Sequence, residues 1–287
     1  METKIIDGKK ISKEILEEVK KEISSLLFQP VFCDILVGED PASKQYVKMK
    51  ARTAETAGIH FHNASFPSTI TTEDLIKEIK ILNEMPNMCG IIVQLPLPLS
   101  LNKQAILDSI DPRLDVDCLG TVASKKFYGG ETELGFPTAF ACMEILDSIN
   151  LDLSDKKIVV LGQGDLVGKP VTHLLRSREL FVDIITRSTG NKEELIKNAD
   201  VIISGMGNGR FITGEMIKEG VVLIDAGTSE ARNGPVDGGV KIVGDVDLES
   251  VKGVAGFVSP VPGGVGPVTV AMLLKNVLKV AKDKNNA

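Results

Sequence analysis

The chain reads Lys-Ile-Val-Val-Leu-Gly-Gln-Gly-Asp-Leu-Val-Gly from Lys157 to Gly168. An apolar strand pattern leads into a glycine turn, and a helical pattern follows the turn. In a dinucleotide-binding turn the first glycine, here Gly162, permits the sharp bend, and the second, here Gly164, lets a pyrophosphate approach the backbone. The free N–H groups at the start of the helix favour a bound anion. The stretch therefore predicts a nucleotide-binding turn in a parallel α/β sheet.

The glycine spacing in this turn is one residue longer than the usual fingerprint, so alone it also fits a turn that needs glycine only for its geometry. Further strand patterns at Phe181–Thr186, Asp200–Ser204 and Val221–Asp225, with weaker ones near 240–243 and 255–258, favour the nucleotide site. An NAD site usually carries an acidic residue at the tip of the second strand. Arg187 lies there instead, which favours the 2′-phosphate of NADP; a solvated loop charge is the alternative reading.

The first half of the chain shows a similar alternation. Helical patterns are predicted near 9–27, 43–57, 72–83 and 101–109, and strands at Val31–Val37 and Gly90–Leu95. Thr71 is predicted to cap the helix at 72–83. The rhythm is lost over 119–136, where glycines lie among polar residues, and a final helix is predicted near 268–282. The fold class expected is α/β, with two domains.

Composition agrees with an ordinary globular protein. The 287 residues include 43% hydrophobic residues, and 39 Asp and Glu outnumber 33 Lys and Arg, for a net charge of -6. That apolar content argues against disorder, and the acidic balance gives no support to nucleic-acid binding. The N-terminus lacks the apolar core of a signal peptide, and no apolar run reaches the ~18–20 residues of a membrane span. A cytoplasmic protein without nucleic-acid or membrane partners is expected.

Cysteine and histidine offer little for a metal centre. The four cysteines are far apart and are expected to be buried free thiols: Cys33, Cys89, Cys118 and Cys142. Of three histidines, His60 and His62 alternate with Phe61 as on one face of a strand, and no carboxylate or Cys pattern accompanies them. No metal site is predicted.

Four other segments carry chemistry-bearing residues. Tyr46 and Lys50 share one face of the helix predicted at 43–57, although surface pairs of this kind are common. A partly buried lysine can act as acid or base near neutral pH. Gln94 ends an apolar strand, which also fits an exposed edge, and the segment Asp115-Val116-Asp117 also fits a turn with caps. A loop rich in proline and glycine over 259–267 also fits a rigid connector.

Together the segments Val37–Lys50, Gly90–Pro98 and Pro260–Pro267 resemble the bifunctional methylenetetrahydrofolate dehydrogenase/methenyltetrahydrofolate cyclohydrolase family, the FolD type, over about residues 3 to 280. The resemblance implies a folate-binding catalytic domain over 1–136 and 265–287, to which the last helix returns. It implies a Rossmann domain that binds NADP over 137–264. It further implies a homodimer.

The resemblance also implies roles for particular residues. It identifies Lys50 as the catalytic lysine, Tyr46 as its neighbour, Gln94 as the residue that positions it, and Asp117 as the anchor of the pterin ring. It places Pro262 and Gly263 in the loop that lines the folate pocket. The implied contacts of the nucleotide are Gly162, Gln163, Gly164, Arg187 and Thr228.

The activity implied is oxidation of 5,10-methylenetetrahydrofolate with NADP, then hydrolysis of the methenyl product to 10-formyltetrahydrofolate. The usual Gly-Arg-Ser of the cofactor turn reads Gly162-Gln163-Gly164 here, which lacks the charge and the hydroxyl. Three alternatives therefore stay open: an NAD-preferring or cyclohydrolase-dominant variant, a binding protein without turnover, and a two-domain dehydrogenase for another small substrate.

Overall fold

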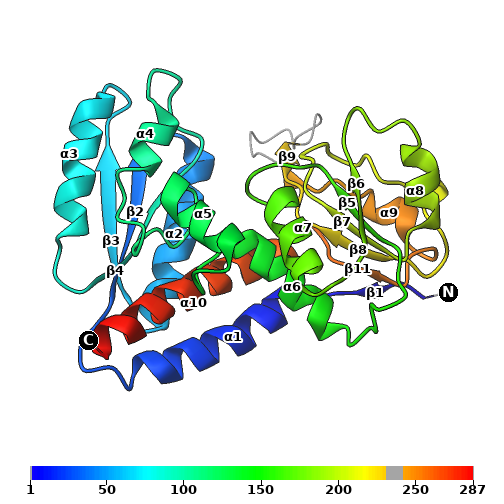
Figure 1. Ribbon diagram of the computed structural model, residues 1–287, viewed down its shortest axis with the longest axis horizontal. Helices are drawn as coiled ribbons and strands as arrows, with labels where there is room; N and C mark the ends of the chain where they lie inside the picture. Colours follow the sequence, from blue (N-terminus) through cyan, green and yellow to red (C-terminus); the bar gives the residue numbers. More distant parts are fainter. Residues whose placement is uncertain (1, 231–241, 287) are drawn as a thin grey trace. The chain divides into compact units, whose positions relative to one another are not determined.

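The computed structural model describes residues 2–230 and 242–286, and the chain divides into two compact units (Figure 1). The six-stranded unit comprises Met1–Ser12 and Thr138–Thr269, and the three-stranded unit comprises Lys13–Pro137 and Val270–Ala287. Each contains a parallel sheet with helices against it, so the expected two-domain α/β class is confirmed.

The sheet of the six-stranded unit has the order β1-β11-β8-β7-β5-β6, and all its neighbouring strands are parallel. Its strands are β1 (Lys4–Ile5), β5 (Ile158–Leu161), β6 (Val182–Ile185), β7 (Val201–Ser204), β8 (Val222–Asp225) and β11 (Phe257–Val258). The chain passes from β5 to β6 on one side and returns to β7 on the other. The carboxyl end of β5 is therefore the point where the strand order reverses, which is where open α/β sheets bind ligands.

The first residues of the chain pair with the sheet of the six-stranded unit. β1 pairs with β11 in parallel, Lys4 opposite Phe257, and Lys4 N donates to Gly256 O over 2.9 Å. An edge of the six-stranded sheet thus takes up the first residues of the chain. Two-residue strands carry no periodic signal, because periodicity needs a longer window.

The remaining elements of this unit cover the sheet or connect its strands. They are α6 (Pro137–Ser148), α7 (Gly168–Ser177), α8 (Lys192–Asn198), the 3₁₀ turn η1 (Gly214–Met216), α9 (Leu248–Val251), and the antiparallel pair β9 (Ser229–Glu230) and β10 (Ile242–Val243). Residues 240 and 241, part of one weaker strand prediction, lie outside the described residues.

The sheet of the three-stranded unit has the order β3-β2-β4, and its strands are parallel. The strands are β2 (Val31–Val37), β3 (His60–Phe66) and β4 (Met88–Val93). The helices are the greater part of α1 (Gly8–Ile23), α2 (Pro41–Thr56), α3 (Thr72–Asn83), α4 (Lys103–Leu107), α5 (Thr121–Gly129) and the greater part of α10 (Val265–Asn285). All seven residues of the central strand β2 are buried. Thr71 caps α3 as predicted, since its hydroxyl accepts from Asp74 N over 3.1 Å.

The last helix does return to this unit, as expected. Asn276 Nδ2 donates to Val116 O over 2.9 Å and to Gly135 O over 2.7 Å, and Asn285 Oδ1 accepts from Leu27 N over 3.0 Å. α10 lies beside α1 (Figure 1), and an ion pair joins Lys282 to Glu22. Helix α5, in contrast, lies in the stretch where no pattern was predicted.

A buried carboxylate organises the loop after β7. Asp245 Oδ2 accepts from Ser204 Oγ over 2.7 Å and from Met206 N over 2.8 Å, while Oδ1 accepts from Asn208 N over 2.6 Å. Asp245 is fully buried. Its three bonds offset the cost of desolvating the charge.

Asp245→Asn is expected to lower the free energy of unfolding by about 3 kcal/mol, because an amide nitrogen would face buried donors and leave them unpaired. Urea unfolding of the variant measures the loss. The exposed Asp155 in the same unit provides the matched control, Asp155→Asn. A midpoint for Asp245→Asn equal to that of the control would contradict this role.

Candidate active site

Lys50 occupies a core-facing position of helix α2. Asp40 caps this helix by accepting from Ser43 N over 2.7 Å, and the buried face of the helix consists of Ser43, Val47, Lys50 and Ala54. The spacings of four, three and four residues are those of one helical face. Lys50 is only 8% exposed. A buried ammonium is stable only when it is paired, so its partners define the site.

Gln94 is the first partner of Lys50. Its Oε1 accepts from Lys50 Nζ over 2.8 Å, and its Nε2 donates to Leu95 O over 2.9 Å, which holds the amide with the oxygen facing the lysine. Gln94 N also donates to Ile35 O over 2.8 Å, so the residue prolongs the ladder between β4 and β2. The structure thus brings Lys50 and Gln94 together, 44 residues apart in the sequence.

Asp34 is the second partner, and the sequence analysis missed it. Its Oδ2 lies 2.6 Å from Lys50 Nζ, and its side chain is fully buried in the middle of β2. The signal that could have found it is an acidic residue inside the apolar run Val31–Val37. Burial raises the pKa of Asp34, while the charge of Lys50 opposes that rise.

Asp117 belongs to the same electrostatic group. The pKa of its carboxyl is raised to about 7: burial is the largest cause, the charge of Lys50 opposes the rise, and the charges of Asp115 and Asp34 add to it. Asp115 is buried, and its Oδ2 accepts from Gly120 N over 2.7 Å, so it does serve in the turn. Asp34 and Asp117 therefore both interact with Lys50, and a proton can reside on Asp117 near neutral pH.

Tyr46 precedes Lys50 by one turn of α2 and is 39% exposed. Its ring is thus available to a ligand, and no hydrogen bond joins its hydroxyl to a residue of the described ranges 2–230 and 242–286. Pro262 and Gly263 belong to the six-stranded unit. A turn closes this loop, since Gly264 N donates to Pro260 O over 2.7 Å.

The glycine turn after β5 has the backbone of a phosphate-binding turn. Gly162 has a φ of +88°, and a Cβ at Gly168 would lie 2.1 Å from Gly162 O, so the start of α7 packs directly on the turn. A Cβ at Gly164 would meet nothing within 4 Å. No side-chain cap bonds the N-terminus of α7. Lys169 N donates to Gly164 O over 3.2 Å and Pro170 has no N–H, so the open space at Gly164 is what fits the approach of a nucleotide pyrophosphate.

The side chains around this turn differ in how available they are to a bound nucleotide. Gln163 Nε2 donates to Gly162 O over 2.9 Å and to Thr172 Oγ1 over 3.2 Å, so its amide braces the turn. Arg187 is exposed two residues after β6, and Thr228 is exposed three residues after β8. Because carboxyl ends of parallel strands share one edge of a sheet, the turn, Arg187 and Thr228 lie along the same edge.

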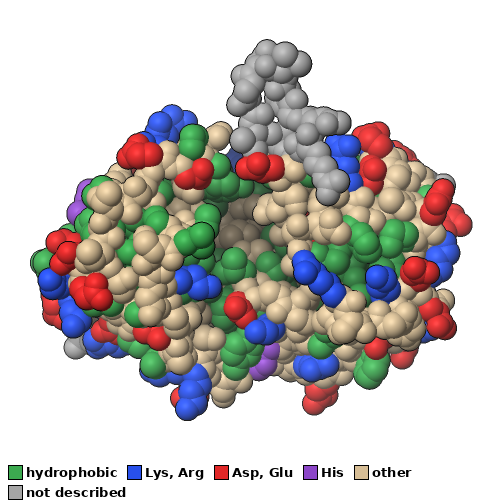
Figure 2. Space-filling view, turned by 90° about the horizontal axis from the view of Figure 1, so that it is seen from above, with side chains coloured by type: hydrophobic (Ala, Val, Ile, Leu, Met, Phe, Trp, Pro, Cys, Tyr) green, Lys and Arg blue, Asp and Glu red, His purple; other side chains and the backbone are tan. Residues whose placement is uncertain are grey.

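The four cysteines are buried free thiols, as expected. Within residues 2–230 and 242–286, no group of three or more His, Cys, Asp or Glu side chains is arranged to hold a metal ion, and no helix is both long and apolar enough to cross a membrane. On the face shown in Figure 2, acidic and basic side chains are interspersed.

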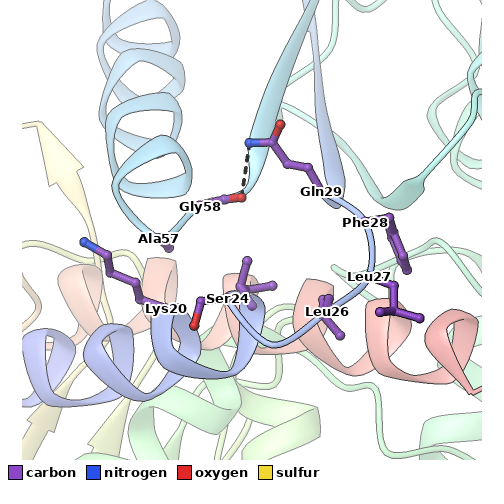
Figure 3. Close-up of a pocket in the computed structure, with 9 residues that line it drawn as sticks. Lys20, Ser24, Leu26, Leu27, Phe28, Gln29, Ala57 and Gly58 are labelled. Carbon is purple, nitrogen blue, oxygen red and sulfur yellow. Dashed lines mark hydrogen bonds between the residues drawn. The ribbon is translucent and has the colours of Figure 1, made fainter.

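A pocket of about 440 Å³ lies at the amino ends of β2 and β3, where Gln29 Nε2 donates to Gly58 O over 3.3 Å (Figure 3). Lys20 is its one ionisable lining residue. Gln94 follows the carboxyl end of β4 in the same parallel sheet, so the pocket is at the opposite edge from the Lys50 site.

Known proteins resemble this chain over nearly its whole length. The bifunctional protein FolD of Nautilia profundicola is 40% identical over 282 residues, covering 97% of each chain. The crystal structure of FolD from Campylobacter jejuni is 36% identical with a TM-score of 0.91, covering 98% of this chain and 99% of that one. The Trypanosoma brucei enzyme, complexed with NADP cofactor and inhibitor, is 34% identical with a TM-score of 0.94 over the whole of both chains.

Two family profiles account for most of the sequence. The tetrahydrofolate dehydrogenase/cyclohydrolase catalytic domain matches residues 6–117, and the NAD(P)-binding domain of the same family matches residues 137–285. The chain therefore belongs to the tetrahydrofolate dehydrogenase/cyclohydrolase family.

Proposed function

We propose that this chain oxidises 5,10-methylenetetrahydrofolate with NADP⁺ and then hydrolyses 5,10-methenyltetrahydrofolate to 10-formyltetrahydrofolate. The observation that carries the proposal is the buried Lys50, held by Gln94 and flanked by Asp117, in a chain of this family. We assign folate binding to 1–136 and 265–287, and cofactor binding to 137–264. By the same family membership we propose that the protein is cytoplasmic and forms a homodimer. Light scattering tests the dimer.

The glycine turn is the proposed binding site of the cofactor. Gly162 and Gly164 would admit the pyrophosphate to the N-terminus of α7, and Gln163 would maintain the turn through Thr172. Arg187 would contact the 2′-phosphate, and Thr228 would contact the nucleotide. When bound, NADP⁺ supplies the acceptor for a hydride, and the protein supplies orientation and electrostatics.

Lys50 is the proposed acid–base group of the hydrolysis. Water adds to the methenyl carbon, and one of its protons passes to the neutral amine of Lys50. The bond from that carbon to N5 then breaks, N5 takes the proton from Lys50, and the hydroxyl proton leaves for solvent as the formyl C=O forms. Gln94 would orient the amine. The net reaction consumes one water and releases one proton.

Asp117 and the neighbouring surfaces would hold the folate. The carboxyl of Asp117 would accept from the pterin N–H groups, and its negative form would attract the methenyl cation. Tyr46, exposed on α2, would stack beside the substrate, and Pro262 and Gly263 would line the folate pocket. The test is direct: purified protein is given 5,10-methylenetetrahydrofolate with NADP⁺ or NAD⁺, and formation and decay of the methenyl species are followed. No turnover with either cofactor would refute the proposal.

Arg187→Ala is expected to raise KM for NADP⁺ roughly tenfold, since a charged contact to phosphate contributes about 1.5–3 kcal/mol. KM for NAD⁺ is expected to stay unchanged, because NAD⁺ lacks the 2′-phosphate. Steady-state kinetics with both cofactors measure the difference. Unchanged NADP⁺ kinetics would show that Arg187 makes no such contact and would favour the NAD-preferring alternative.

A further inference from the structure

The acidic side chain of Asp34 has no explanation in the packing of its strand. It lies at the centre of β2, in register with Ile92 of β4 and Asn63 of β3. Every residue of β2 is buried, and the other positions of that strand are apolar. A β-branched apolar residue would suit such a position, whereas a carboxylate there is costly to desolvate.

Lys50 is the counter-charge of Asp34. Among the described residues, no donor reaches either carboxylate oxygen with hydrogen-bond geometry, and Lys50 Nζ lies 2.6 Å from Oδ2. The ammonium therefore has Gln94 Oε1 at 2.8 Å and Asp34 Oδ2 at 2.6 Å as its two oxygen neighbours. Both neighbours are acceptors, so both favour the protonated amine.

The other titratable groups near this pair are few. Asp117 interacts with both Lys50 and Asp34, and Asp115 acts on Asp117. Tyr46 lies on the same helix, and Gln94, at the end of β4, is neutral. Cys33 precedes Asp34 on β2; burial and the charge of Asp34 raise the pKa of its thiol, so it stays neutral. Asp34 is thus the carboxylate in direct contact with the lysine.

We infer that Asp34 is a positioning residue that holds the ammonium of Lys50 against Gln94 and restrains the release of its proton, so that it sets the pH range of the hydrolysis. This inference rests on the proposed function. The amine must be neutral to take a proton from water, and the adjacent carboxylate opposes that neutral state. Hydride transfer requires no proton from Lys50, so the pH dependence of the dehydrogenase is set by other groups.

The experiment compares Asp34→Asn and Asp34→Val with the wild-type enzyme. In a plot of hydrolysis kcat against pH, the rate increases as the amine becomes neutral. In both variants this increase is expected at a pH at least about one unit lower than in the wild type, because the charge in contact with the amine has been removed. The pH profile of the dehydrogenase kcat should move less. A change in the charge of Asp117 would instead alter KM in both reactions. Asp74→Asn, an exposed acid on α3, is the matched control.

Two measurements distinguish a role of Asp34 in the protonation of Lys50 from an effect on folding alone and from a failure of the proposed activity. Asp34→Val leaves the buried ammonium of Lys50 without its counter-charge and should lower the thermal midpoint. The pH profile of the folded variant should still move, which a purely structural Asp34 would not produce. The protonation of the Lys50 amine can also be followed by ¹⁵N NMR without substrate, with Lys50→Met as the assignment control. Loss of the proton at the same pH in wild type and in both variants would overturn the inference, whether or not the protein hydrolyses folate.

Discussion

Lys50→Met is expected to reduce the hydrolysis of 5,10-methenyltetrahydrofolate by at least about 100-fold, the usual contribution of a positioned acid–base group. Methionine has nearly the length of lysine and is apolar, so it suits the buried face of α2. It has no amine to take the proton from the attacking water. The rate of methenyl decay, corrected for spontaneous hydrolysis, measures the effect.

The same substitution should also weaken the fold in a pH-dependent way. Without Lys50, the carboxyl of Asp34 loses its counter-charge, and breaking a buried pair costs roughly 3–5 kcal/mol. Because burial raises the pKa of Asp34, the folded state holds the proton more tightly than the unfolded state. The loss of stability should therefore be small in acid and should grow as the pH rises above the ordinary range of an aspartate.

A double variant separates the two effects. Asp34→Val with Lys50→Met replaces the buried pair by apolar residues, which is often neutral or stabilising. It should recover the stability lost by Lys50→Met but none of the hydrolysis. Lys48→Met, at an exposed position of the same helix, is the matched control and should behave as wild type. Hydrolysis at the wild-type rate in Lys50→Met would remove Lys50 from the mechanism.

Gly168→Ala is expected to weaken NADP⁺ binding by more than tenfold and to lower the free energy of unfolding by about 1–3 kcal/mol. The added Cβ would lie 2.1 Å from Gly162 O and 2.9 Å from Gln163 Cα, and both are backbone atoms that cannot rotate away. The start of α7 must therefore shift away from the turn. Fluorescence titration with NADPH and urea unfolding measure the two losses.

Two other glycines sharpen this test. A Cβ at Gly164 meets nothing within 4 Å, so Gly164→Ala should fold as wild type and lose affinity only because the methyl group obstructs the pyrophosphate. Gly190 is also unobstructed, and Gly190→Ala is the control for stability. If Gly168→Ala bound NADPH as tightly as wild type, the turn after β5 would not be the phosphate site.

The structure corrects two expectations about local elements. Helix α5 was missed because Gly120 and Gly130 bound it and only Ala123 and Phe127 are buried, so its apolar pattern is too short to recognise. Strand β1 was missed because its two residues are strand only by pairing with β11. Strand β1 thus depends on a partner far away in the sequence.

The features that the chain's own pattern predicts are local: the alternation of strands and helices, the glycine turn at Gly162, and the shared helical face of Tyr46 and Lys50. These follow from periodicity and spacing, which act within one element. The tertiary structure alone decided which groups meet Lys50. Gln94 and Asp34 reach it because β4 and β2 are neighbours beneath α2. The protonation of a buried lysine depends on such contacts, because in a desolvated site the nearest charges determine its state.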